Sequence, residues 1–532
     1  MKKWTVVAIL AIAQFVMVLD STVMNVSISQ VVKDLGTTVS GLQAAITFYT
    51  LTMAALMLTG GKLGDKWGRL NAFKIGAVVY GIGSLITALS PNLGVLMFGW
   101  SLIEGLGAIL IIPAIASLVA YNYDGKPRVT AFAIIGGVSG AAAAAGPLIG
   151  GFVTTYFSWR YVFAAETLIV IGLLLVANKI KDPGRPKEKI TIDLSSVLLS
   201  ASGMFLFVFG LLQSKTWGWI RPLAKPTING QEIAPFGISI VAYLIVIGLF
   251  VLWLFYVRQD GLEKKGKQAL LKVSMLSIKV LRAGLAVLAS QYLITAAIFF
   301  AIPIYLQMVL GLDALQTGIK IFPLSVALIL ASVVGSRLAN NYPPKKIIRV
   351  GQLALVIGSL LLFVGIEPTL TGGIFGAGMF VVGAGLGLLA SQLGNVNMSS
   401  VSDNEANEAG GLQGTAQNLG SSLGTALIGS LLIFFLTSSF VTAVNQNPDL
   451  PSSVKQAVAQ ASQKGIEIIP ASQVEQIGLD KGLTQDQAEE LTQTYTESQV
   501  GSLQQAMFFV VIFAVLSFIL SRNIPDKIVA KK

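Results

Sequence analysis

Four carboxylates lie in or at the edge of apolar runs of the 532-residue chain: Asp20, Glu104, Glu166 and Asp193. A charge at the bilayer centre costs roughly 2.5 to 3.5 kcal/mol on insertion scales, so acids in such runs usually face a cavity and mark an ion or substrate pathway. Removal from water favours the protonated carboxyl, whereas an arriving cation or an opening cavity favours proton release. Asp20 and Glu104 are therefore the predicted proton-coupling residues.

The other two acids have a simpler structural interpretation. Asp193 directly precedes an apolar run, where Asp commonly caps a helix. Glu166 lies six residues beyond Arg160, and we expect these two residues to form an ion pair at the membrane boundary. The alternative for Glu166 is a secondary acid of the same pathway.

The residue types that are absent limit the chemistry further. The chain has no Cys and no His, which removes thiolate nucleophiles, the commonest metal ligand and the neutral-pH proton carrier. It also has no G-x-x-x-x-G-K-[ST] loop for a nucleotide. We therefore expect no enzyme, no metal and no cofactor, and the proton motive force as the energy source. An ion channel is a weaker alternative, because it requires a ring of filter residues.

The composition excludes a soluble globular protein. Hydrophobic residues make up 54% of the chain and charged residues only 12%, whereas ordinary soluble domains carry about 25% charged residues. A membrane helix needs about 20 apolar residues, and we predict an all-α membrane protein. Its fourteen spans are expected near residues 5–26, 41–60, 72–90, 93–120, 129–156, 161–178, 193–213, 236–257, 280–306, 316–335, 347–366, 371–393, 414–437 and 503–521.

The net charge of +11 comes from Lys and Arg residues whose placement indicates the orientation of the chain in the membrane. With the N-terminus inside, 28 of the 37 Lys and Arg residues fall on the inner side, which is the positive-inside asymmetry. Both termini are then cytoplasmic in a multi-pass plasma (inner) membrane protein, and no nucleic-acid partner is expected. Ala11 and Ala13 resemble a signal-peptide cleavage site, but the apolar run continues to Val26, so the first span is predicted to be retained.

Internal similarity indicates two parallel repeats. The segment after the second span, 61–69, resembles the segment after the tenth, 336–345, and the fifth and thirteenth spans are both rich in glycine. Both matches imply a shift of eight spans, hence two six-helix bundles with two inserted helices. The predicted domains are 1–180 (N-terminal bundle), 181–275 (inserted spans 7 and 8) and 276–532 (C-terminal bundle, including an outer acidic loop at 438–502).

The outer loop at 438–502 holds eight acidic residues and three lysines. Thr484 followed by Gln487 fits a capping box, and the segment predicts two short helices joined by a turn. It is expected to be a solvated hairpin, with an acidic lid over the pathway as the alternative.

Three motifs carry a resemblance to a known family. The segment after span 2 reads G-x-L-G-D-x-x-G-R, span 5 contains Gly146-Pro147-Leu148-Ile149-Gly150-Gly151, and span 1 contains Leu19-Asp20-Ser21-Thr22-Val23-Met24-Asn25-Val26. Together they resemble the fourteen-helix drug:proton antiporters of the major facilitator superfamily. The resemblance implies a major facilitator fold, alternating access and multidrug efflux, with Gly146, Pro147, Gly150 and Gly151 as the antiporter motif.

The first of these motifs is also the predicted conformational latch. Glycines permit a tight turn there, and an Asp beside basic residues can pair with a helix end across the two repeats. The predicted latch residues are Gly61, Gly64, Asp65, Gly68 and Arg69.

Span 4 departs from the family pattern R-x-x-Q-G-x-G, since Ser101 stands in place of Arg and Glu104 in place of Gln. These exchanges make the cavity more anionic and favour a cationic substrate. Polar and aromatic residues predicted near the cavity would suit lipophilic cations through cation–π and apolar contacts, although each alone could serve packing or interfacial anchoring. They are Asn25, Tyr49, Trp100, Gln291, Tyr292, Tyr305 and Gln392.

The sequence thus predicts a proton-coupled exporter of lipophilic, cationic drugs or toxic compounds. It is expected to work in the lipid bilayer as a monomer, with a small-molecule substrate and protons as its partners. Export of an endogenous metabolite or lipid by the same fold is the alternative.

Overall fold

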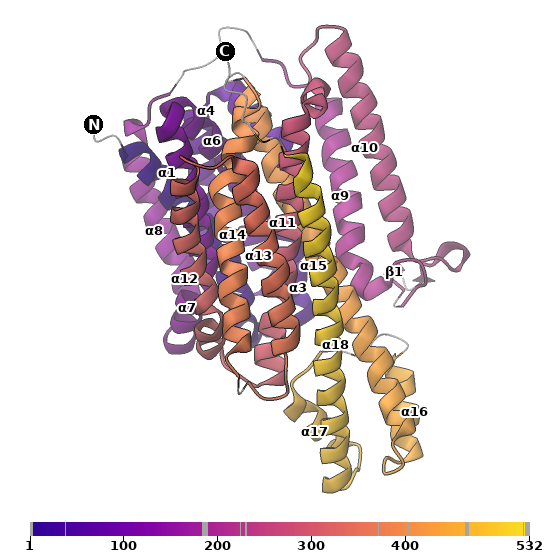
Figure 1. Cartoon of the computed structure of the whole chain (residues 1–532). Coiled ribbons are helices and arrows are strands. Elements are labelled where there is room, and N and C mark those ends of the chain that lie inside the picture. Colours follow the sequence, from indigo (N-terminus) through magenta and orange to yellow (C-terminus); the bar gives the residue numbers. More distant parts are fainter. Residues whose placement is uncertain are drawn as a thin grey trace.

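Fourteen helices long and apolar enough to cross a membrane form the body of the molecule (Figure 1). The computed structural model describes residues 4–37, 39–182, 190–223, 225–228, 231–370, 372–402, 405–462, 466, 468–524 and 526. The prediction of an all-α membrane protein with fourteen spans is confirmed. The helices follow the predicted spans because the length of each apolar run sets the length of helix that can be buried in lipid.

The spanning helices are, in chain order, α1 (Thr5–Val26), α3 (Val39–Trp67), α4 (Arg69–Ala88), α5–η1–α6 (Leu93–Leu96, Met97–Glu104, Gly105–Asn122), α7 (Gly125–Tyr156), α8 (Arg160–Val176), α9 (Leu194–Trp217), α10 (Ile240–Lys264), α11–η5 (Lys279–Ile304, Tyr305–Val309), α12 (Ala314–Leu338), α13 (Pro344–Gly365), α14 (Ile374–Ser399), α15 (Ala406–Gln446) and α18 (Gln485–Leu520). The shorter elements are α2 (Ile28–Asp34), α16 (Ser452–Ser462), α17 (Ala471–Asp480), the 3₁₀ turns η2 (Ala177–Lys179), η3 (Pro235–Gly237), η4 (Val273–Ser277) and η7 (Ser521–Asn523), and a hairpin of β1 (Thr227–Ile228) with β2 (Gln231–Glu232).

The two inserted helices, α9 and α10, pack on each other beside the bundle (Figure 1). Helix α9 reaches the bundle through Leu211, which lies in one apolar cluster with Leu51 of α3 and Ala426 of α15. Helix α10 exposes large apolar side chains such as Phe250 and Trp253, as expected of a helix that faces lipid. The division of the chain at residues 180 and 275 stays a prediction.

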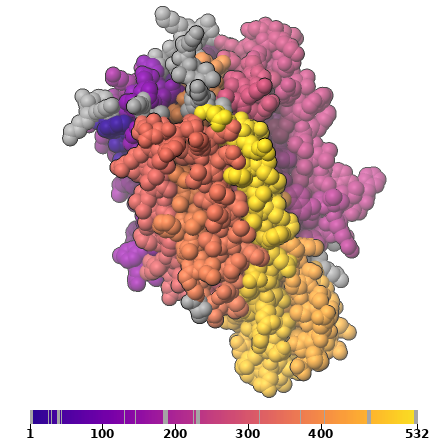
Figure 2. Space-filling view, in the orientation of Figure 1, coloured from indigo at the N-terminus to yellow at the C-terminus, as the bar shows by residue number. Residues whose placement is uncertain are grey.

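The predicted outer loop is largely helical. Helices α15 and α18 run well past the predicted spans 414–437 and 503–521, and with α16 and α17 they form a lobe that projects from the bundle (Figure 2). The lobe has its own apolar core, in which Phe440 of α15 meets Tyr495 of α18 edge to face. The two short helices and the capping box of Thr484 and Gln487 are confirmed, whereas the loop boundaries are corrected because paired apolar faces continue both long helices into the lobe.

Helix α1 begins, and α18 ends, at the end of the bundle opposite the lobe (Figure 1). We call these the terminus end and the lobe end.

Small residues let the long helices approach closely. At Gly420 and Gly424 of α15, an added Cβ would collide with the main-chain carbonyl oxygens of Ala289 and Leu293 of α11. This small-xxx-small spacing is typical of tight helix pairs in membranes. The contact joins the first and the fifth spanning helix of the C-terminal bundle.

We predict that Gly424→Ala destabilises the protein, since a methyl group forced against a backbone oxygen costs roughly 1 to 3 kcal/mol through backbone shifts. The apparent melting temperature in detergent should fall by several degrees. Gly172→Ala is the matched control, because no atom lies within 4 Å of a Cβ added at Gly172. Equal melting temperatures for the two variants would contradict the close contact.

Candidate functional site

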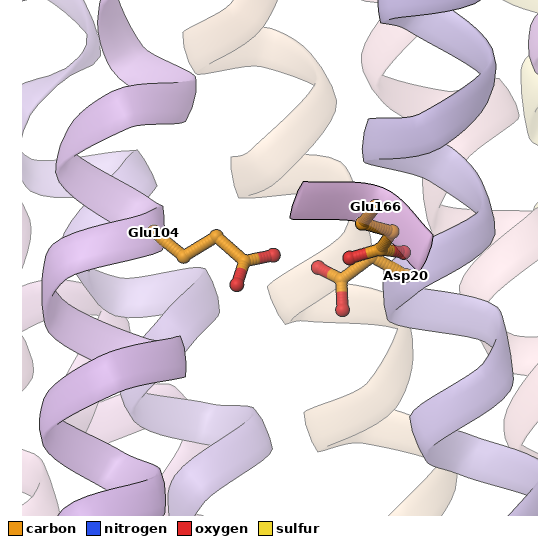
Figure 3. Close-up of side chains that lie close together, drawn as sticks. All are labelled: Asp20, Glu104 and Glu166. Atoms are coloured by element: carbon orange, nitrogen blue, oxygen red, sulfur yellow. The ribbon is translucent and has the colours of Figure 1, made fainter. Parts of the chain in front are cut away.

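Three acids from distant parts of the chain meet inside the N-terminal bundle. Asp20 of α1, Glu104 at the end of η1 and Glu166 of α8 each place a carboxylate oxygen within 4.8 Å of the other two, and their side chains point toward one another (Figure 3). All three are buried, with exposed fractions of 0%, 0% and 1%. We call this group the carboxyl cluster. The predicted pair Asp20 and Glu104 therefore lies together, and Glu166 joins it.

This position corrects the expected ion pair between Glu166 and Arg160. Arg160 instead approaches Asp34 at 3.6 Å and donates a hydrogen bond to the carbonyl oxygen of Ser90 at 2.8 Å. Six residues correspond to about 9 Å along a helix and to directions about 120° apart around its axis. Arg160 thus lies at the lobe end of α8, while Glu166 points into the bundle.

The hydrogen bonds within the cluster are few. The indole N–H of Trp100 donates to both oxygens of Asp20, at 2.8 and 3.0 Å. The hydroxyl of Ser84 donates to one oxygen of Glu104 at 3.1 Å. Among the described residues, the other oxygen of Glu104 and both oxygens of Glu166 make no hydrogen bond of ordinary geometry. A buried acid with unsatisfied oxygens is held ready for a proton or a cation.

The local structure explains how Trp100 and Glu104 reach Asp20. Both lie on the π-helix η1, a rare conformation that is frequent at functional sites. A Cβ added at Gly83 of α4 would lie 2.6 Å from the backbone nitrogen of Glu104, so glycine there lets α4 bring Ser84 to the acid. Tyr49 of α3 stacks on Trp100 with ring centroids 4.9 Å apart, which fixes the indole in place.

The electrostatics of the cluster limit its charge. At an effective dielectric constant of about 20, two like unit charges separated by 4.8 Å, the limit within which one oxygen of each acid lies, repel by about 3.5 kcal/mol. In the part of the chain that the structure describes, no Lys or Arg forms an ion pair with any of the three acids. Without a bound cation the cluster is therefore expected to carry at most one negative charge, and protons must occupy the other carboxyls.

The antiporter motif connects this cluster to the boundary between the two halves. A Cβ added at Gly146 or Gly150 of α7 would meet Thr22 or Val23 of α1, the turn that follows Asp20. On its other side, α7 meets α12, where the carbonyl oxygen of Pro147 lies 2.8 Å from a Cβ added at Gly318. Gly151 is buried on the same helix. Helix α7 is thus packed between the acid-bearing helix α1 and a helix of the other half.

The predicted latch segment differs from the expected glycine-rich loop. Gly61, Gly64 and Asp65 belong to the last turns of α3, and only Gly68, at φ 91°, forms the turn into α4. Arg69 approaches the carbonyl oxygen of Ser117 on α6 at 3.5 Å, within the same half. The expected contact of Asp65 with the other repeat stays a prediction.

A contact across the two halves is made by a neighbouring residue that the sequence analysis did not select. The ammonium of Lys62 lies 3.0 Å from a carboxylate oxygen of Glu408 at the start of α15, and their side chains are only 9% and 5% exposed. The pair lies at the terminus end, where it joins α3 to α15. The opposite charge of the two residues was the only signal in the sequence, and they lie 346 positions apart.

The predicted cavity residues fall into separate places. Tyr49 and Trp100 border the carboxyl cluster, whereas Gln291 is buried and Tyr292 half-buried on α11. The amide of Gln392 on α14 donates to the carbonyl oxygen of Gly335 on α12 at 3.0 Å. The side chain of Asn25 lies outside the described part of the chain.

Tyr305 makes a contact at the lobe end. Its hydroxyl donates to the carbonyl oxygen of Glu367 at 2.6 Å and accepts the N–H of the same residue at 3.1 Å. It therefore ties the lobe end of α11 to the segment after α13, and its place in a substrate cavity stays a prediction.

Asp193 has the predicted structural role. Its carboxylate accepts the backbone N–H of Ser196 at the start of α9 and forms a two-point contact with the guanidinium of Arg258, at 2.7 and 2.9 Å. The hydrogen bonds from Arg258 and Ser196 hold the pKa of Asp193 well below its usual range. This acid is therefore a charged cap that joins α9 to α10.

Fourteen candidate membrane helices, a buried acid cluster and a charged contact across two halves define a polytopic membrane protein in which two halves enclose buried ionisable groups. Comparison with known proteins agrees. The family model of the Major Facilitator Superfamily matches residues 10–223 and 230–425, so the chain belongs to this superfamily.

Several curated relatives match most of the chain. It is 28% identical over 455 residues to a probable actinorhodin transporter of Streptomyces coelicolor, covering 84% of this chain and 75% of the relative. It is 28% identical over 435 residues to the puromycin resistance protein pur8 of Streptomyces alboniger, covering 80% and 81%. The multidrug efflux pump LfrA of Mycolicibacterium smegmatis is 24% identical over 464 residues, with 87% of each chain covered.

Solved structures support the fold. The proton:xylose symporter XylE matches with a TM-score of 0.58 at 11% identity, covering 98% of this chain and 96% of that chain. A bacterial homologue of the human lysosomal transporter Spinster, in an inward-facing conformation, matches with a TM-score of 0.56 at 14% identity, covering 98% and 97%.

We predict that Lys62→Gln shifts the protein toward states in which the terminus ends of α3 and α15 are separated. Removing one partner of a buried ion pair costs roughly 3 to 5 kcal/mol, because the other charge is left uncompensated. Since the chain has no native Cys, spin labels at Lys66→Cys and Asn340→Cys can report the separation of the halves by pulsed electron resonance. The longer-distance population should increase.

The exchange variant that combines Lys62→Glu with Glu408→Lys should restore the parental distribution. Lys74→Gln is the matched control, since Lys74 donates only to Asn178 within its own half among its recorded contacts. An unchanged distance distribution in Lys62→Gln would remove the ion pair from the closing mechanism.

Proposed function

We propose that this protein is a proton-coupled exporter of lipophilic, cationic drugs or toxic compounds that works by alternating access. The observation that carries the proposal is the buried carboxyl cluster, which lacks an ion-pair partner among the described residues. Its acids must hold protons when no cation is present. Relatives named for resistance to antibiotics or for multidrug efflux support the export of drugs.

In the proposed cycle, an organic cation displaces protons from the carboxyl cluster, and protons returning from the other side displace the cation. The aromatic pair of Tyr49 and Trp100 beside Asp20 offers a face for a flat or aromatic cation. Movement of α7 against α12 would open the lobe end of the bundle while the contact between Lys62 and Glu408 closes the terminus end.

The direction of transport follows from the proposed topology. The terminus end is taken as cytoplasmic in the plasma membrane because basic residues concentrate there. A proton that enters along about 150 mV gains about 3.5 kcal/mol, but a monovalent cation that leaves costs the same amount, so one-for-one exchange is driven by the pH gradient alone. Protons and the small-molecule substrate are then the only partners required besides the bilayer, no cofactor is needed, and the monomer suffices.

Export of an endogenous metabolite is the second candidate. The riboflavin transporter RibZ of Clostridioides difficile is 25% identical over 469 residues and is covered to 95%, and one fold can host many substrates. The two candidates differ in the effect of substrate charge. Substrate-dependent proton release from the purified protein, measured with organic cations and with riboflavin in parallel, distinguishes them.

We predict that Asp20→Asn abolishes transport against a gradient while expression and membrane insertion remain normal, since Asn keeps the size but cannot titrate. In proteoliposomes with an imposed pH gradient, uptake of tetraphenylphosphonium should fall to the level of protein-free vesicles. Asp260→Asn is the control, because Asp260 pairs with Lys264 within α10, away from the cluster. Gradient-driven transport by Asp20→Asn would refute the assignment.

We predict that Glu104→Gln impairs divalent cations more than monovalent ones. With fewer titrating acids, a dication that leaves for one entering proton moves a net positive charge outward, which costs roughly 2.3 kcal/mol per 100 mV. Monovalent tetraphenylphosphonium and the bisamidine pentamidine should be compared in vesicles with imposed pH and voltage gradients. If Glu104 only packs between helices, Gln preserves its contacts, and both cations will be exported as by the parent.

A further inference from the structure

Glu166 is the least explained acid of the molecule. It is 1% exposed and neither of its oxygens makes a hydrogen bond of ordinary geometry. The expected partner Arg160 lies elsewhere, at Asp34. The side chain nevertheless points at Asp20 and Glu104 (Figure 3). Three carboxyls at this distance can stay together only when protons or a bound cation reduce their mutual repulsion.

Among the described residues, no Lys or Arg forms an ion pair with Glu166. Helix α1 contributes Asp20 and η1 contributes Glu104, while α3 and α4 contribute the buried phenols of Tyr49 and Tyr80. None of these groups is cationic at neutral pH. The charge of the site is therefore set by how many protons or substrate cations it holds.

We infer that Glu166 is a third proton-carrying acid, so that the carboxyl cluster releases two protons when it binds a divalent organic cation. This inference rests on the proposed function and extends it to stoichiometry and substrate charge. The inference takes the resting cluster to carry the single negative charge that the repulsion allows, and therefore to hold two protons. A dication breaks the two remaining O–H bonds, both protons leave to water, and three carboxylates with one dication again sum to one negative charge.

The same proton count predicts how many protons a cluster of only two carboxyls releases. A cluster of two carboxyls that tolerates one negative charge at rest holds a single proton, so it can release only one whatever the charge of the substrate. A monovalent cation displaces one proton from either cluster. Glu166 therefore matters for the proton count with dications and not with monovalent cations.

The test counts protons released by the full-length protein in nanodiscs, in weakly buffered solution with a pH-indicator dye, on addition of pentamidine or tetraphenylphosphonium. Bound ligand is measured in parallel by calorimetry. The parent should release about two protons per pentamidine and one per tetraphenylphosphonium. Glu166→Gln should release one proton with either ligand, whereas Glu166→Asp, which keeps a titrating acid, should release two with pentamidine.

A second measurement uses the parent protein alone, so it does not require any variant to fold. In infrared difference spectra of the parent, pentamidine should remove about twice the C=O absorption of protonated carboxyls that tetraphenylphosphonium removes. Asp260→Asn, which lacks an exposed carboxyl of α10, should match the parent in both measurements.

Three outcomes would overturn the inference: two protons released by Glu166→Gln with pentamidine, one proton released by the parent with pentamidine, or release of the same two protons by Ca²⁺ alone, which would make the cluster a metal site. The first two leave proton-coupled export intact, provided that the parent still releases protons on binding a cation. Absence of any substrate-dependent proton release from the parent would instead refute the proposed function itself.

Discussion

The burial of three carboxyls that form no ion pair with a described Lys or Arg is the constraint on which the rest of the site depends. Mutual repulsion at such short distances favours protonation of the acids. The number of protons on the three carboxyls therefore depends on whether a cation is bound. The residues around the carboxyls are held in fixed positions, which keeps the acids together despite their repulsion. Trp100 is fixed by its stacking on Tyr49 and by two hydrogen bonds to Asp20, and Gly83 admits the backbone of Glu104.

The carboxyl cluster lies close to the boundary between the two halves. The turn of α1 that follows Asp20 packs on Gly146 and Gly150 of α7, and α7 packs against α12 of the other half. Asp20 is thus one helix away from that boundary. At the terminus end, the buried ion pair of Lys62 and Glu408 joins α3 to α15 across the two halves. In the proposed mechanism, a change of charge at Asp20 reaches the boundary through α7.

The two halves differ in chemistry although their helices repeat. The buried acids of the cluster all belong to the N-terminal bundle, whereas the C-terminal bundle buries neutral amides such as Gln291, Gln352 and Gln392. Several atoms of these amides make no hydrogen bond to described residues. An amide carries no titrating proton, so in the proposed mechanism the first half exchanges protons and the second supplies neutral polar and apolar contacts to the substrate.

The sequence by itself determined the number of spanning helices, the cap at Asp193, the capping box at Thr484, and the presence of Asp20 and Glu104 inside apolar spans. These are local properties, because the transfer of a segment or a side chain out of water depends on its own composition. The sequence did not determine the lengths of α15 and α18, which continue into the lobe on apolar contacts. Partners were decided only by the tertiary structure. From its position in the sequence, Glu166 was expected to pair with Arg160, six residues away. The rotation and packing of the helices instead place Glu166 beside Asp20, 146 residues away, and Lys62 beside Glu408, 346 residues away. The free-energy cost of burying a charged side chain depends on the segment that contains it, so the sequence reveals it. The groups that offset this cost come from other helices, so they depend on which helices pack together.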